Sequence, residues 1–143
     1  MTDWRKTSRS TQTSGACSIS QHAALAALNG PRHFIGETRA VFERRRNMMV
    51  QMLNETHGRT FSTPGGAFYA FESCEGLIGR TTPAGTLLRT DEDVVRALLD
   101  EANVAVVQGS AFGLAPYIRI AYALNHESLR RACEAIRCFC ALL

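Results

Sequence analysis

Lysine and long apolar runs are nearly absent from this sequence of 143 residues. Lys6 is the only lysine, so the formal net charge of +3 depends almost wholly on arginine. No apolar run approaches the ~20 residues that a transmembrane helix requires, so we expect no membrane partner. The one basic run, residues 44–46, would fan over roughly 200° of a helix instead of forming a patch. We therefore expect no nucleic-acid partner either.

The cysteines and histidines show no spacing that is typical of a metal site. No CxxC pair occurs and the four histidines are scattered, so we predict no metal-binding residue. Five cysteines without a recognisable signal peptide favour a reducing compartment, and we expect a cytoplasmic location. Residues 1–15 are basic and rich in serine and threonine, which is also compatible with a short transit peptide.

The first half of the sequence predicts two helices. Ser18 with Gln21 fits a capping box, which predicts a helix over residues 19–28. Pro31 is favoured at the first position of a helix and predicts the start of a second one. Apolar residues at helical spacing continue that second helix to about Glu55, and Gly58 would end it.

The second half predicts strands that alternate with helices. Residues 67–71 are rich in aromatic side chains and predict a strand. Residues 74–90 contain several glycines and are expected to be a loop. The continuously apolar residues 104–107 predict a strand buried on both faces. A β-branched segment over residues 117–122 predicts another strand.

Two further helices are indicated by their amino-terminal residues. Thr90 with Asp93 resembles a capping box and predicts a third helix, while Asn125 is suited to cap a last helix. The order of elements predicts an α/β fold of the two-layer α+β kind, with a small mixed sheet covered by helices. We expect residues 1–17 to be extended or disordered and residues 18–143 to form one domain.

Arg119 is the first candidate for chemistry. Side chains alternate along a strand, so Ile118 and Ile120 share one face while Tyr117 and Arg119 share the other. A guanidinium among apolar neighbours is costly to bury unless an anion meets it. Its planar fork suits a carboxylate in a bidentate arrangement. The alternative interpretation is an arginine on an edge strand whose charged end reaches water.

The glycine-bearing segment 108–113 is the second candidate. Glycines allow either a tight turn or a close approach to a ligand, and we favour a structural connection. Asp91, Glu92 and Asp93 are interpreted as charges that favour a helix amino terminus. The sequence has no serine–histidine–acid or cysteine–histidine spacing that can be argued, so we predict no catalytic residue.

Five motifs in the expected order together resemble the carboxyl-terminal small domain of class I/II pyridoxal-phosphate-dependent aminotransferases, in particular the bacterial aspartate aminotransferases. These motifs are SISQHAALAALNGP (18–31), FERRR (42–46), PGGAFY (64–69), VAVVQGSAFG (104–113) and PYIRIAYA (116–123).

The resemblance implies amino-group transfer between an amino acid and a 2-oxo acid, with pyridoxal 5'-phosphate as the cofactor and a homodimer as the assembly. It gives Arg119 the role of binding the substrate's α-carboxylate. Residues 1–5 resemble the family's "MTGWR" stretch, which makes Arg5 the counterpart of the arginine that binds the cofactor phosphate. The family's Schiff-base lysine would then fall before Met1, and Lys6 is in the wrong place. We therefore expect this chain alone to be catalytically incompetent.

Two other functions stay open at this point. One is a non-catalytic ligand-sensing module, as in the aminotransferase-related domains of some transcription regulators, although no winged-helix segment precedes it here. The other is a dimer-interaction module derived from an aminotransferase. Substrate side-chain specificity depends in the family on groups outside this segment.

Overall fold

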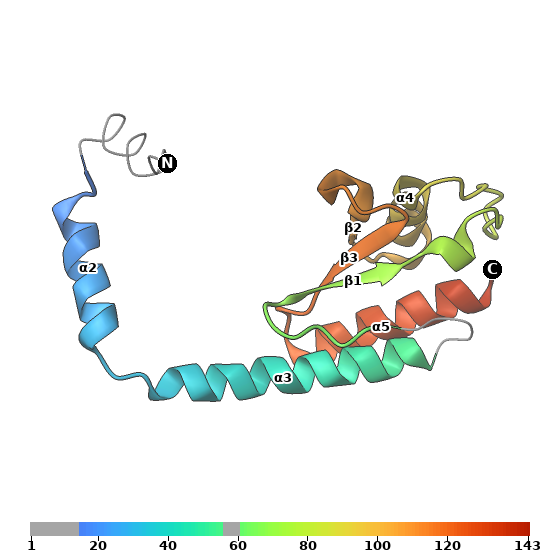
Figure 1. Ribbon diagram of the computed structural model, residues 1–143. Coiled ribbons are helices and arrows are strands. Elements are labelled where there is room, and N and C mark those ends of the chain that lie inside the picture. The colour runs from blue at the N-terminus through green and yellow to red at the C-terminus, as the bar shows by residue number, and fades with distance from the viewer. Residues whose placement is uncertain (1–14, 56–60) are drawn as a thin grey trace. The chain divides into compact units, whose positions relative to one another are not determined.

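The computed structural model describes residues 15–55 and 61–143, and its contacts divide the chain into two units, Met1–Glu37 and Thr38–Leu143 (Figure 1). The first unit contains α2 (Ser18–Asn29) and the first residues of α3 (His33–Asn54). The second unit contains the rest of α3 and every strand of the described chain. Within the described ranges, no helix is long and apolar enough to cross a membrane.

Helix α2 forms where the sequence predicts it, but the prediction of a capping box at its start is wrong. Ser18 is already helical, and the cap residue Cys17 makes no side-chain cap hydrogen bond. The backbone N–H of Gln21 donates to the Cys17 carbonyl at 3.1 Å, and its side chain donates to the Ala16 carbonyl at 2.7 Å. No residue of α2 is buried.

Helix α3 begins at His33, two residues later than the predicted start at Pro31. The backbone leaves α2 in an extended conformation at Gly30, and the Arg32 carbonyl then accepts the Ile35 N–H at 3.1 Å. The helix ends at Asn54, in agreement with the predicted end near Glu55. Gly58 lies outside the described residues.

The second unit is built on a three-stranded sheet of order β1-β3-β2, formed by β1 (Tyr69–Ser73), β2 (Val107–Gln108) and β3 (Tyr117–Ala121). The predicted fold class, a small sheet with helices on it, is confirmed. Both strand pairings are antiparallel, so the expectation of a mixed sheet is wrong in that detail.

Two strand predictions need correction. β1 begins at Tyr69 and not at Ala67, because Ala67 has a positive φ of 62° and belongs to the turn before the strand. The apolar segment 104–107 is not a central strand. The Val104 N–H donates to the Leu98 carbonyl of the preceding helix, so only Val107 and the next residue pair with β3, at the edge of the sheet.

The two late helices start as predicted. At α4 (Asp91–Ala102), the Thr90 hydroxyl accepts the Asp93 N–H at 3.2 Å and the Asp93 carboxylate accepts the Thr90 N–H at 3.0 Å. At α5 (His126–Ala141), the Asn125 side chain accepts the Ser128 N–H at 2.8 Å. Each cap satisfies amide groups that the first turn of a helix leaves free.

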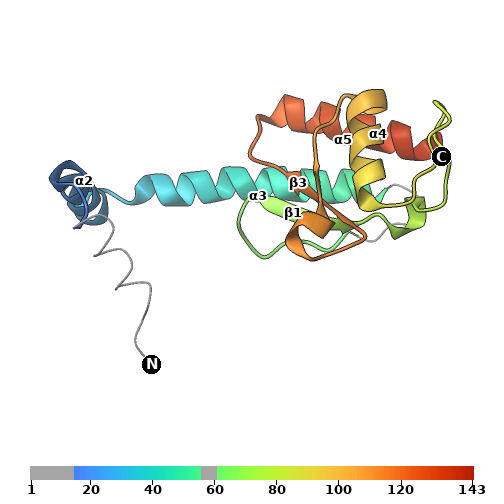
Figure 2. The same ribbon diagram turned by 90° about the horizontal axis from the view of Figure 1, so that it is seen from above.

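One face of the sheet carries the hydrophobic core. Ile118 and Ile120 point to this face from β3 and are buried, as the predicted alternation requires. Figures 1 and 2 show α5 and the carboxyl-terminal part of α3 running along it. Full burial of each large aliphatic side chain contributes about 1.5–3 kcal/mol. The core also takes up residues from these helices, from α4 and from the loop after β1, namely Met49, Leu53, Leu77, Leu88, Val94, Leu98, Leu129, Cys133, Ile136 and Phe139.

Candidate functional site

Arg119 lies in the middle of the central strand, on the sheet face opposite the core. Its pairing partners are Phe71 on β1 and Val107 on β2. The alternative interpretation, an arginine on an edge strand, is therefore wrong, because a strand lies on each side of it. The side chain is partly buried, and it stands among apolar neighbours as the sequence predicts.

Two aromatic rings enclose the guanidinium. The Cζ atom of Arg119 lies 4.4 Å from the centroid of the Tyr69 ring and 4.4 Å from the centroid of the Phe112 ring. Both distances are well inside the ~6 Å range in which a ring face attracts a cation. The Phe112 ring in turn meets Phe71 edge to face, with centroids 5.8 Å apart. Tyr69 and Phe112 were not identified from the sequence as site residues.

No anion partner for Arg119 is present in the described part of the chain. Within residues 15–55 and 61–143, its guanidinium contacts the two rings and forms neither an ion pair nor a hydrogen bond. A guanidinium carries five N–H donors in a planar fork. Its donors are thus free for an external anion, and a planar carboxylate matches their geometry best.

The turn that carries Phe112 is fixed from two directions. In the short helix η2 (Gly109–Phe112), the Ser110 N–H donates to the Asp91 carboxylate at 2.8 Å. Asp91 is only 4% exposed, at the start of α4. A Cβ atom on Gly109 would stand 2.1 Å from the Leu114 carbonyl oxygen, so only glycine fits there. The turn is a structural connection, as predicted, and it also places a ring on Arg119.

The three acids at the start of α4 have three different partners. Asp93 forms the capping box, and the Arg89 N–H is the main reason that the pKa of this carboxyl lies below its usual value of 3.8. Glu92 pairs with Arg96 at 3.3 Å on the surface. Asp91 turns away to the η2 turn, a role that the interpretation as helix-end charges missed. A partner 19 residues away leaves no local sequence pattern.

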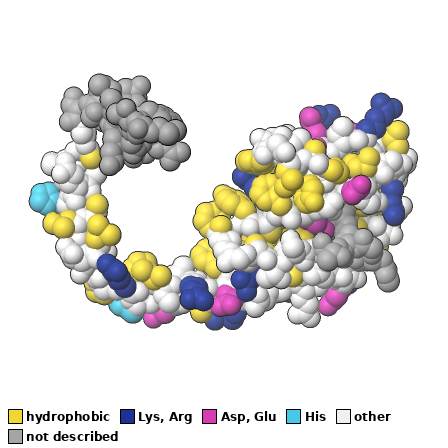
Figure 3. All heavy atoms as spheres, in the orientation of Figure 1, with side chains coloured by type: hydrophobic (Ala, Val, Ile, Leu, Met, Phe, Trp, Pro, Cys, Tyr) yellow, Lys and Arg dark blue, Asp and Glu magenta, His cyan; other side chains and the backbone are white. Residues whose placement is uncertain are grey.

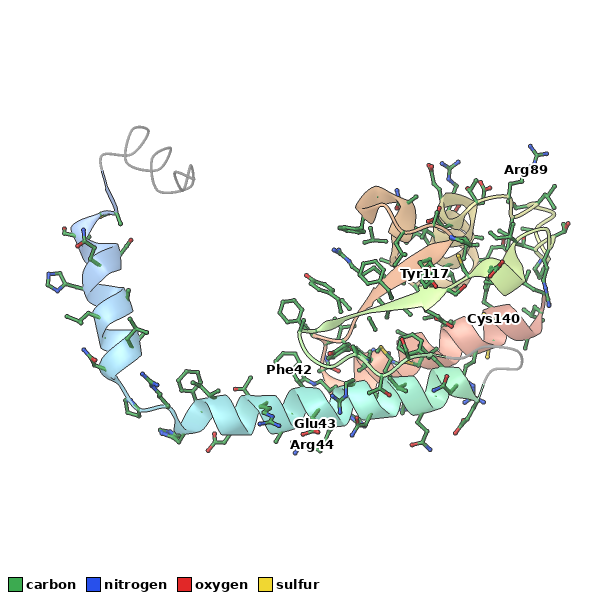
Figure 4. The ribbon with its side chains drawn as sticks, viewed as in Figure 1. Phe42, Glu43, Arg44, Arg89, Tyr117 and Cys140 are labelled. Atoms are coloured by element: carbon green, nitrogen blue, oxygen red, sulfur yellow. The ribbon has the colours of Figure 1, made fainter. Side chains whose placement is uncertain are left out.

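The turn before Tyr69 is held by Tyr122. This side chain is buried, and its hydroxyl donates to the Ala67 carbonyl at 2.9 Å. Burial raises the pKa of the phenol above its usual value. Figure 4 shows Phe42 projecting from α3 on the side of this turn, and its ring lies 6.2 Å from Phe68 and 6.4 Å from Tyr122.

Hydrophobic side chains gather on the surface beside Arg119. Figure 3 shows them over the η2 turn and the turn before β1. The exposed residues that the contacts place here are Tyr69 and Phe112, which face Arg119, and Phe68, whose ring lies against Tyr69. The guanidinium therefore lies against two of these partly exposed rings, Tyr69 and Phe112.

A groove of about 700 Å³ lies elsewhere in this unit, lined by residues of α5, the end of α3 and the loop after β1. An ion pair at 3.3 Å joins Arg137 to Glu55 there. None of the residues around Arg119 lines this groove. Within the described ranges, no group of three or more His, Cys, Asp or Glu residues could hold a metal ion.

Arg5 and Lys6 lie outside the described residues. The proposed phosphate contact of Arg5 therefore stays a prediction. The described part of the chain contains no lysine.

The chain is similar to known proteins along nearly all of its length. Residues 3–136 match the family described as aminotransferase class I and II. The chain is 54% identical over 129 residues to a "Probable aspartate/prephenate aminotransferase" of Rhizobium leguminosarum bv. phaseoli, covering 90% of this chain and 32% of that protein. It is 50% identical over 135 residues to the "Aspartate/prephenate aminotransferase" of Cereibacter sphaeroides, covering 94% and 34%.

The fold is similar to that of a solved structure as well. The crystal structure of the aspartate aminotransferase from Rhizobium meliloti superposes with a TM-score of 0.89 at 45% sequence identity, over 96% of this chain and 34% of that one. The chain thus spans about a third of the length of the curated relatives that it matches.

Proposed function

Because the chain belongs to the class I and II aminotransferase family, we propose that it is the part of an aspartate-type aminotransferase that holds the substrate's α-carboxylate on Arg119. The single observation that carries this proposal is the geometry of Arg119. Its guanidinium stands on the open face of the sheet between two rings at 4.4 Å, with no anion partner among the described residues. The substrates would be an amino acid and a 2-oxo acid, as the family implies.

The described residues do not fit the cofactor of this family. The family depends on pyridoxal phosphate, which supplies the chemistry of amino-group transfer and requires a lysine amine as its covalent anchor. The described part of the chain has no lysine, and Lys6 is the only one in the sequence. We therefore derive no step through the cofactor. The proposed role of this chain is to bind and orient a carboxylate, and the chain alone would not transaminate.

Arginine modification tests the carboxylate role. The purified chain is treated with phenylglyoxal, with and without 2-oxoglutarate, and the modified arginines are located by peptide mass spectrometry. We expect 2-oxoglutarate to slow modification of Arg119 and to leave Arg89 unaffected. Arg89 is a suitable internal control because its side chain projects outward from the loop before α4 (Figure 4). Equal protection of both arginines, or of neither, would argue against a specific site.

Cofactor incubation tests the proposed incompetence. The chain is mixed with pyridoxal phosphate, reduced with borohydride and mapped by mass spectrometry. We expect no stoichiometric adduct at one position. A single adduct formed in a one-to-one ratio would show that the chain retains an anchor, and the proposal that it acts only by binding a carboxylate would then be wrong.

The homodimer implied by the family finds support in α2. Ile19, Leu25 and Leu28 are between 57% and 78% exposed on this helix, Leu25 and Leu28 on one side and Ile19 on another. A helix with exposed apolar side chains on more than one side is typical of one that contacts a partner. We propose that α2 takes part in self-association. Light scattering at several concentrations tests this: the wild-type chain should exceed the monomer mass, and the double variant Leu25→Ser/Leu28→Ser should approach it. A wild-type chain that is monomeric throughout would refute the proposal.

A further inference from the structure

We infer that Tyr69 and Phe112 are positioning residues for Arg119, which we call the carboxylate clamp. Together the two rings hold its guanidinium from two sides before any ligand binds. This inference rests on the proposed role of Arg119 and deepens it. We refer to the two rings as the aromatic clasp. Its two members lie at the same distance, 4.4 Å, from the Cζ atom of Arg119.

The two rings of the clasp reach Arg119 from different elements. Tyr69 is the first residue of β1 and pairs with Ala121, so it stands diagonally across from Arg119 on the same face of the sheet. Phe112 ends the η2 turn, which precedes β3 in the chain. Among the described aromatic contacts, Tyr69 pairs with Phe68, with ring centroids 4.6 Å apart, and Phe112 pairs with Phe71. None of these contacts joins the two clasp rings to one another.

Each ring of the clasp is anchored by contacts that do not involve Arg119. The buried Asp91 carboxylate holds the η2 turn through Ser110, and the close packing at Gly109 fixes the path of the turn. On the other side, the Tyr122 hydroxyl holds the turn that leads into Tyr69. The backbone that carries each ring is therefore held without Arg119, so both rings are presented to the guanidinium from elements that are anchored independently of it.

A fixed guanidinium binds a carboxylate more tightly than a mobile one. An arginine side chain has many rotamers, and a ligand that must select one of them loses binding free energy. Ring faces attract the cation and limit those rotamers without using any of its N–H donors. The clasp thus prepares Arg119 for a bidentate carboxylate and leaves the donors for the ligand.

The test follows the Nε–Hε signal of Arg119 in the NMR spectrum of the ¹⁵N-labelled chain, with sodium acetate as the carboxylate probe. The signal is assigned by its loss in Arg119→Lys. Ring currents should displace it from the signals of exposed arginines, and acetate should shift it in a saturable way. Tyr69→Leu and Phe112→Leu keep apolar bulk but remove the ring. Each should move the signal toward the exposed group and weaken acetate binding about two- to fivefold.

Conservative and distant variants separate positioning from mere stability. Tyr69→Phe and Phe112→Tyr keep a ring and should retain both the displaced signal and the acetate affinity. Phe34→Leu is the matched control, since it removes a phenyl ring that is 56% exposed, compared with 50% for Phe112, from another part of the chain. It should change neither readout. Backbone amide spectra establish that each variant is folded.

Two outcomes would overturn the inference, and they can be told apart. If the leucine variants fold, leave the Arg119 signal in place and bind acetate as the wild type does, the clasp has no positioning role, while the proposed role of Arg119 stands. If the wild-type signal is displaced but acetate does not shift it, the rings enclose an arginine that binds no carboxylate. The proposed function and the positioning role would then both be wrong.

Discussion

Ser110 donates its backbone N–H to the buried carboxylate of Asp91 at 2.8 Å, which joins the first turn of α4 to the turn that carries Phe112. A single hydrogen bond therefore connects a helix start to the surroundings of Arg119. The contact joins two segments 19 residues apart in the sequence and lies partly out of solvent, where a hydrogen bond to a charged acceptor has its greatest effect.

Replacing Asp91 should loosen this turn. Asp91→Ala leaves the Ser110 N–H without its acceptor, and we expect the free energy of unfolding to fall by about 1–3 kcal/mol. Asp91→Asn keeps a side-chain oxygen and should lose less. Glu92→Ala, one residue along on the surface, is the control and should stay within about 0.5 kcal/mol of the wild type. Urea unfolding measures all three. Equal free energies of unfolding for Asp91→Ala and Glu92→Ala would show that the Ser110–Asp91 hydrogen bond does not contribute to stability.

Gly109 should tolerate no side chain. A Cβ atom there would stand 2.1 Å from the Leu114 carbonyl oxygen and 2.7 Å from the Cβ of Tyr117, so the backbone would have to move. We expect Gly109→Ala to destabilise the chain by about 1–3 kcal/mol, as overpacking does elsewhere. Gly76→Ala is the matched control, because an added Cβ would meet nothing within 4 Å. Thermal unfolding that ranks Gly76→Ala as the worse variant would contradict the described packing.

The capping box of α4 should make stability depend on acid pH. The Arg89 N–H and the Thr90 hydroxyl hold the pKa of Asp93 below its usual 3.8 in the folded chain. The native state therefore favours the carboxylate, and the stabilisation is present above the unfolded pKa and lost as pH falls through the folded pKa. The free-energy difference between the wild type and Asp93→Asn should be constant above about pH 5 and shrink below it. A difference that stays unchanged down to pH 2 would contradict this.

Two cysteines on α5 should differ in reactivity. Cys133 is buried against the sheet, and burial raises the pKa of its thiol from 9.0 to about 11. Cys138 lies on the same helix and is exposed. Since the thiolate is the reacting form, about 0.1% of Cys133 would be reactive at pH 8. Mass spectrometry after brief iodoacetamide treatment should find Cys138 labelled and Cys133 labelled only in denaturant. Labelling of Cys133 in the folded chain would indicate a more open core.

The parts of the structure that the sequence predicted depend on short-range patterns. The alternation of Ile118, Arg119 and Ile120 placed the arginine opposite the core because a strand has a period of two residues. The capping residues Thr90 and Asn125 marked the starts of α4 and α5 because each acts on an amide group within the next three residues. Arg119 could be identified as a candidate from the same kind of short-range pattern, because it is a charged residue in the middle of an apolar strand.

The parts that the sequence did not predict depend on long-range contacts. Tyr69 and Phe112 meet at Arg119 only after β1 and β3 have paired, and no spacing along the chain indicates this. The apolar segment 104–107 has the composition of a central strand, but its backbone bonds to α4 and its pairing is limited to an edge. Pro31 is favoured at the first position of a helix but does not fix the start there, and α3 begins two residues later, at His33.

The most direct measurement of the central claim is the binding of 2-oxoglutarate to the wild-type chain and to three variants, followed by isothermal titration calorimetry. Loss of a charge-assisted bidentate contact corresponds to about 1.5–3 kcal/mol, so Arg119→Gln should weaken binding at least about tenfold. Arg119→Lys keeps the positive charge but not the planar pair of N–H donors, so its affinity for 2-oxoglutarate should lie between those of the wild type and Arg119→Gln. Arg89→Gln, which removes an exposed arginine, should match the wild type. If Arg119→Gln binds as tightly as the wild type, Arg119 is not the carboxylate clamp.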